Sequence, residues 1–194
     1  MAQDSLMVQI FAEVRRALKK ESVRGSVIIA AAKIEEQLEE LLKNRFLLCC
    51  EDNDLLFNGG NAPIGTMSSK IELAYRTGCI SAKLRKSLHI LRKLRNDFAH
   101  LSHEISFDTQ SVKDRTRNLL KLNSEFVELI WRESRDEIFS AVGITESPKC
   151  EDYFTDMLQN AGYRHAFEIW ASAVAGSLAE KCSEIVRLEV NGDA

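Results

Sequence analysis

The chain has 194 residues, of which 45% are hydrophobic and 28% are charged, so it contains enough apolar material for a folded core. Its formal net charge is −3, which argues against a general nucleic-acid binder with a basic field. The chain contains no run of about eighteen apolar residues, so no membrane span is predicted. The first residues lack the pattern of a signal peptide. We therefore expect one cytoplasmic domain over residues 1–194. Two prolines and nine glycines leave room for long helices.

Two amphipathic helices are predicted in the first part of the chain. The first, expected over 4–20 with Asp4 as its N-cap, repeats apolar residues at helical spacing: Leu6, Ile10, Val14 and Leu18. The second has a broad apolar face: Ile28, Ala31, Ala32, Ile34, Leu38, Leu41, Leu42 and Phe46. Turn-forming residues then predict a loop over 49–66.

A short helix and a longer helix follow the loop. Ser68 or Ser69 is expected to cap the short one, which ends near Arg76 with Gly78 as a stop. Ser81 is expected to cap the longer one. Its apolar stripe consists of Leu84, Leu88, Leu91, Phe98 and Leu101.

The last third of the chain, 109–190, predicts two further long helices. One starts at Asp108 or Thr109 and runs to about Glu137, with an apolar face of Leu119, Leu122, Phe126, Leu129 and Ile130. After a linker over 143–148, the other covers 152–190, with an interruption allowed at 160–162. The fold class is therefore all-α, a single-domain bundle of roughly six helices.

The helix that starts at Ser81 contains polar residues in unusual positions. Arg95 falls inside the apolar arc, where a leucine is expected, so it needs an ionic partner or a neighbour outside the core. A salt bridge to a glutamate of the second helix or a contact with a partner chain would satisfy it. His89, Asn96 and His100 share a different face near Lys93, and Asn96 is placed to orient the imidazole of His100. A simpler interpretation of His100 is a helix-end histidine at the negative end of the dipole.

The segment Arg95-Asn96-Asp97-Phe98-Ala99-His100 resembles the arginine and histidine motif of the HEPN superfamily. The wider stretch 24–107 is similar to the mannitol operon repressor family, with a vaguer likeness over 109–190. The matching pieces are Arg24-Gly25-Ser26, Ala31 to Leu42, Pro63-Ile64-Gly65, Ser69 to Tyr75, Gly78-Cys79-Ile80, Leu91 to Asn96 and Phe98-Ala99-His100.

The resemblance to the repressor family implies an all-helical bacterial protein connected with transcriptional control of sugar-alcohol uptake genes. It implies action through a regulatory protein partner in the cytoplasm and a homodimer. It does not imply a surface that reads DNA, and it implies no cofactor.

The resemblance to HEPN ribonucleases implies an alternative function, metal-independent cleavage of RNA by two protomers, as in the toxin of a toxin–antitoxin pair. The catalytic residues would be Arg95, Asn96 and His100. His100 would act as base or acid at the 2′-hydroxyl, Arg95 would stabilise the charged transition state, and Asn96 would fix the histidine. The sequence leaves open whether the chain is an enzyme.

A DNA-reading helix-turn-helix over 68–93 is a third hypothesis, because Ala74, Gly78 and a basic second helix fit its pattern. Ser87 and the length of that second helix favour an αα-hairpin inside the bundle instead, so direct DNA contact is not expected.

Other polar and aromatic signals have structural interpretations. The five cysteines form no C-x-x-C pair and are expected to be reduced, without zinc. His100, His103 and Glu104 are too few for a metal site. Four arginines interleaved with acids predict a solvated face: Arg115, Arg117, Arg132 and Arg135. Trp131 and Trp170 are expected in the core or at an interface.

Overall fold

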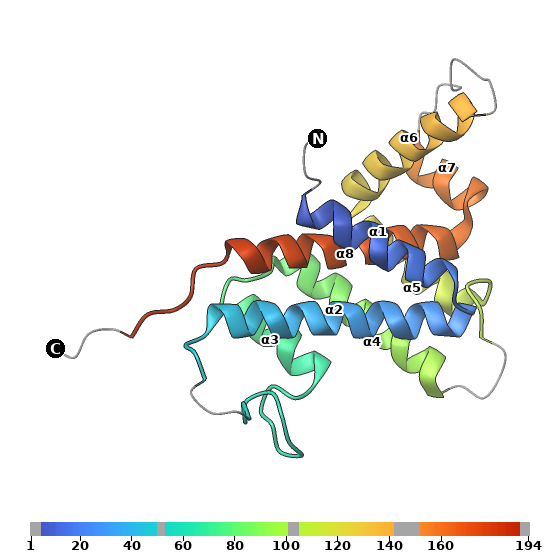
Figure 1. Cartoon of the computed structure of the whole chain (residues 1–194). Coiled ribbons are helices and arrows are strands. Elements are labelled where there is room, and N and C mark those ends of the chain that lie inside the picture. Colours follow the sequence, from blue (N-terminus) through green and yellow to red (C-terminus); the bar gives the residue numbers. More distant parts are fainter. Residues whose placement is uncertain (1–4, 50–52, 101–104, 142–151, 191–194) are drawn as a thin grey trace.

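The computed structural model describes residues 5–49, 53–100, 105–141 and 152–190 (Figure 1). These residues form helices without any strand, which confirms the all-α single-domain prediction. The helices are α1 (Leu6–Lys19), α2 (Val23–Arg45), α3 (Met67–Arg76), α4 (Ala82–His100), α5 (Gln110–Lys121), α6 (Ser124–Ala141), α7 (Tyr153–Asn160) and α8 (Gly162–Glu184). The predicted number of six is too low, because two of the long helices are each divided in the structure.

Helix α8 is the centre of the core. It packs along both α1 and α2, and in Figure 1 these three helices run side by side while α6 and α7 extend away from them. Most of the side chains of α8 are buried, including Trp170, as predicted for this residue. Phe107 lies between Phe98 of α4 and Phe167 of α8, with ring centroids 5.7 and 5.3 Å apart. These aromatic contacts join α4 to the central helix.

Side-chain caps start the first two helices. Ser5 accepts a hydrogen bond from the amide of Val8 at 3.4 Å, so the N-cap of α1 is one residue later than predicted, and Asp4 lies outside the described residues. Ser22 caps α2 by accepting from the amide of Gly25 at 3.0 Å. Each cap satisfies an amide that has no partner inside its helix.

The α3–α4 pair is the predicted αα-hairpin. Its cap prediction was wrong in detail: Thr66 is the N-cap of α3, and Ser69 completes the capping box from inside the helix. Gly78 has φ +73° and follows the last turn of α3, and Ser81 caps α4, both as predicted. Ser87 is fully buried because its hydroxyl donates to the Lys83 carbonyl and accepts from the side chain of Asn123.

The helix predicted from residue 109 to residue 137 is two helices, α5 and α6. The chain turns at Asn123. The side-chain Nδ2 of Asn123 donates to both Ser87 Oγ and the Leu119 carbonyl. The turn changes the helical register, so the predicted apolar face is wrong in α6: Val127 and Trp131 are buried, whereas Leu129 is exposed. No proline or glycine marks this turn in the sequence.

Arg135 corrects the prediction of a solvated arginine face. Its side chain is buried, with Nε 3.3 Å from Asp156 Oδ2 of α7. The same carboxylate oxygen accepts a 2.8 Å hydrogen bond from Trp131 Nε1. Asp156 therefore ties α6 to α7 through two side chains.

The last predicted helix is divided at the allowed interruption and ends earlier than predicted. Gly162, with φ +78°, separates α7 from α8, and α8 ends at Glu184 rather than Val190. Residues 185–190 are extended and return to the end of α2, where the Leu188 amide donates to the Arg45 carbonyl at 2.8 Å. None of the described helices has both the length and the apolar composition needed to cross a bilayer.

Candidate functional site

Helix α4 carries the residues that the sequence singled out. Lys86, Lys93 and His100 are exposed, and His89 and Asn96 between them are partly exposed. Their spacing of three and four residues places all five along one side of the helix. This row, the α4 polar face, agrees with the predicted grouping of His89, Asn96 and His100.

Arg95 points to a different neighbour, the second helix. Its Nη1 lies 3.9 Å from Oε2 of Glu35 in α2, and its side chain keeps 33% of its exposure. Its Nε is buried without a hydrogen bond among the described residues. The predicted helix-two glutamate is the ionic neighbour of Arg95, but the pair is partly exposed rather than buried.

Glu35 also belongs to a buried charge network between α2 and α3. The Nζ atom of Lys70 lies 3.1 Å from Glu35 Oε1 and 2.9 Å from Glu39 Oε2. Burial alone would raise the pKa of Glu39, but hydrogen bonds from Lys43 and Lys70 lower it below its ordinary value. Arg95 therefore adds a third cation, after Lys43 and Lys70, and links α4 to a network that joins α2 and α3.

His100 and Asn96 are not tied to this network. His100 is the last described residue of α4 and is exposed, and no hydrogen bond joins it to Asn96 within the described residues. Five residues along a helix correspond to a rotation of about 140°, so Arg95 and His100 project in different directions. One protomer alone does not bring the two proposed catalytic side chains into one cleft.

His89 is also occupied. Its Nε2 lies 2.6 Å from Glu72 Oε1 of α3, and Arg85 Nε donates to the same carboxylate at 2.9 Å. The hydrogen bond from Arg85, and then the one from His89, lower the pKa of Glu72. The residues His103 and Glu104 lie outside the described residues, and the described ones contain no cluster suited to a metal ion.

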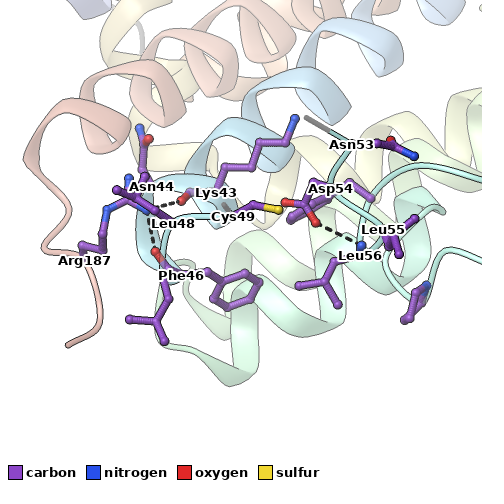
Figure 2. Close-up of a pocket in the computed structure, with 13 residues that line it drawn as sticks. Lys43, Asn44, Phe46, Leu48, Cys49, Asn53, Asp54, Leu55, Leu56 and Arg187 are labelled. Carbon is purple, nitrogen blue, oxygen red and sulfur yellow. Dashed lines mark hydrogen bonds between the residues drawn. The ribbon is translucent and has the colours of Figure 1, made fainter. Parts of the chain in front are cut away.

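A second feature, not foreseen from the sequence, is a hollow of about 780 Å³ where α2 ends (Figure 2). We call it the apolar hollow. Its apolar lining consists of Phe46, Leu47, Leu48, Leu55, Leu56, Phe57 and Pro63. In Figure 2, Leu55 and Leu56 lie on one side of it and Phe46 and Leu48 on the other. Its volume is in the range of ligand and anchor-residue pockets.

The polar groups around the apolar hollow hold its walls. Arg187 Nη1 donates to the carbonyls of Phe46 at 2.6 Å and Lys43 at 3.0 Å, so it caps the C-terminal end of α2. Lys43 Nζ is bonded to Glu39 at 2.6 Å, and Asp54 accepts from the amide of Leu56 at 3.0 Å. The surface that remains for a partner is therefore mainly apolar.

Four exposed leucines line this hollow, and three more exposed apolar side chains belong to the segment that carries Arg187. Among the described residues, eleven large hydrophobic side chains are exposed, and seven of them belong to two segments. These seven are Leu47, Leu48, Leu55, Leu56, Val186, Leu188 and Val190. Scattered exposed apolar residues are ordinary, whereas a group of this size marks an interaction surface. The signal in the sequence was two leucine pairs, 47–48 and 55–56, around a segment that otherwise forms turns.

Comparisons with known proteins give one structural likeness. No protein-family model and no curated protein matches the chain. In the X-ray structure of the MtlR–HPr complex from Escherichia coli, one chain matches with a TM-score of 0.54 and 16% sequence identity. The match covers 90% of this chain and 99% of that chain. The chain therefore has an MtlR-like helical fold.

Proposed function

We propose that this protein is a helical transcription regulator of the mannitol operon repressor type that acts by binding a protein partner at the apolar hollow. The observation that carries the proposal is the group of four exposed leucines, Leu47, Leu48, Leu55 and Leu56, that line that hollow. The likeness to a chain solved in complex with HPr supports a protein as the partner.

The energetics of the surface fit protein docking. Leu48 and Leu55 are 72% and 65% exposed to solvent. Burial of a leucine side chain in a complex contributes roughly 1.5–3 kcal/mol to the free energy of association. The floor beneath them is packed, because Phe46 and Phe57 lie with ring centroids 6.4 Å apart. Such a preformed floor lowers the ordering cost of association.

The direct test uses HPr, the protein named with the structural neighbour. We expect saturable binding of purified HPr to the purified chain in calorimetry, with a negative heat-capacity change because apolar surface is buried. Absence of heat and of a complex in gel filtration over a wide concentration range would exclude HPr as the partner.

A homodimer remains a proposal that rests on the sequence resemblance. The argument that Arg95 meets a partner chain no longer applies, because its guanidinium faces Glu35 within the same chain. Light scattering tests the dimer: we expect twice the chain mass, and the chain mass at high concentration would contradict it.

We also propose, as a second candidate function, metal-independent RNA cleavage by Arg95, Asn96 and His100. The observation that favours it is the exposure of His100 at the end of a helix face that carries Lys86 and Lys93. Because Arg95 and His100 diverge on α4, a composite site between two protomers would have to combine them. There His100 would take the 2′-hydroxyl proton, and Arg95 would stabilise the pentavalent phosphorus.

A further inference from the structure

A second hollow, of about 300 Å³, lies where α8 begins. We call it the polar hollow. It is lined by Lys19 of α1, Glu21 of the α1–α2 turn, and Ala161, Arg164, His165 and Glu168 around the first turns of α8. None of these residues lines the apolar hollow, so the two are separate sites.

The lining has two cations, Lys19 and Arg164, and two carboxylates, Glu21 and Glu168, and Arg15 adds a further cation behind it. Glu168, which is 4% exposed, accepts from Arg15 Nη1 at 3.2 Å and from Arg164 Nε at 2.8 Å. One buried carboxylate is thus shared by two guanidinium groups. Lys19 adds a third cation and forms no ion pair in the part of the chain that the structure describes.

Glu21, the other carboxylate of the lining, is directed to the start of α2. A Cβ atom on Gly25 would lie 2.6 Å from Glu21 Oε2, so this carboxylate lies against the first turn of that helix. There it faces the positive end of the α2 dipole. The carbonyl of Glu21 accepts from Arg164 Nη2 at 2.6 Å and so holds Arg164 at the hollow.

His165 lies against Arg15 at the polar hollow. Arg15 Nη2 lies 3.0 Å from its Nε2 and 3.1 Å from its Nδ1. Burial, and then the charges of Arg15 and Lys19, lower its pKa against the opposing effect of Glu168. The ring is therefore neutral at neutral pH, surrounded by excess positive charge.

We propose that the polar hollow binds a phosphate-type oxyanion, held by Lys19 and Arg164 and bordered by His165. Guanidinium and ammonium groups are the side chains that recognise such anions. The N-cap of α8, Ala161, provides no side-chain bond to the first-turn amides of the helix on which Arg164 and His165 lie. The proposal is independent of the protein partner at the apolar hollow.

The test is a titration of the full chain with inorganic phosphate at constant ionic strength, followed by NMR of the His165 ring and the first amides of α8. We expect a saturable shift and a rise in the pKa of His165, because a bound dianion stabilises the imidazolium. Glycerol phosphate as a second arm distinguishes a phosphomonoester from free phosphate. Shifts that grow linearly without saturation for both ligands would overturn the proposal.

Two neighbouring lysines give a matched pair of variants. Lys19→Gln removes a cation of the hollow and should weaken phosphate binding about tenfold, the effect of one lost charge-assisted hydrogen bond. Lys20→Gln changes the adjacent exposed lysine, which does not line the hollow, and should leave the affinity unchanged. Neither lysine side chain forms a hydrogen bond or ion pair among the described residues, so both variants should fold. Equal effects of the two substitutions would reduce the binding to nonspecific screening and overturn the site.

Discussion

Gly176 of α8 lies against the backbone of Met7 in α1. A Cβ atom placed on Gly176 would come within 2.5 Å of the Met7 carbonyl oxygen and 3.3 Å of its side-chain Cγ. The missing side chain therefore permits the close approach of these two helices. It matters for the whole molecule, because α8 is the helix around which α1 and α2 are arranged.

Replacement of Gly176 by alanine should destabilise the protein by about 1–3 kcal/mol, since the new methyl group must push α1 away from α8. Urea unfolding followed by circular dichroism measures this change. Gly60→Ala is the control, because a Cβ atom at Gly60 meets no atom within 4 Å, and its effect should stay within about 0.5 kcal/mol. Equal stabilities of the two variants would contradict the close approach.

Leu48→Asp should weaken binding of HPr about tenfold or more, because it places a charge in the apolar hollow where a partner side chain must be buried. Leu55→Asp should have the same effect from the opposite wall. Calorimetry with the purified proteins measures both.

Val8→Asp is the matched control for these variants. Val8 is an exposed hydrophobic residue of α1 that does not line the hollow, so its substitution should leave the affinity unchanged. If all three variants bound HPr as tightly as the original chain, the docking surface would have to lie elsewhere.

Arg95→Ala and His100→Ala should differ in stability. Arg95 loses its approach to Glu35 and its packing against α2, so we expect a loss of about 1 kcal/mol. His100 is exposed at the end of α4, and its loss should change stability by less than about 0.5 kcal/mol. Thermal unfolding distinguishes the two.

The same two variants test the ribonuclease alternative. Purified protein is incubated with mixed RNA in EDTA, and the alternative predicts cleavage that both substitutions abolish. Activity that survives in either variant would assign it to a contaminant or to other residues, and inactivity of the original chain would leave Arg95 with its structural role alone.

Acid should destabilise the fold through His165. The pKa of this residue is lowered in the folded chain, so the unfolded chain binds the proton more readily. The contribution of neutral His165 is present above its ordinary pKa of 6.5 and is lost as pH falls through the lower folded value. His165→Gln should therefore flatten the stability profile as the pH falls below 6.5. Parallel profiles for the variant and the original chain would contradict this assignment.

Much of the fold was predictable because its signals are local. The spacing of Ile10, Val14 and Leu18, the glycine after α3 and the serine before α4 depend only on neighbouring residues, and the structure has each feature where the sequence placed it, whereas Leu6 at the start of that stripe is exposed. The break between α5 and α6 was not predictable, because Asn123 acts there through Ser87, a residue of another helix.

The site was less accessible to sequence reasoning. The position of Arg95 on the wheel indicated an ionic partner in α2, and Glu35 is that partner. The apolar hollow was missed, because its walls combine the end of α2 and the loop that follows it with Arg187, which is distant from both in sequence. Helical periodicity carries no information on how such irregular segments meet.

Arg187 gives the apolar hollow a thermodynamic property beyond its shape. Because this side chain fastens residues 185–190 to the last turn of α2, the wall that Arg187 forms exists only while that segment is docked. If docking of residues 185–190 strengthens binding of a partner, thermodynamic linkage requires that the bound partner strengthen this docking. The two effects are equal in free energy. Protection of the Leu188 amide from hydrogen exchange would then rise as the partner fills the hollow. Exchange at this amide would therefore measure complex formation.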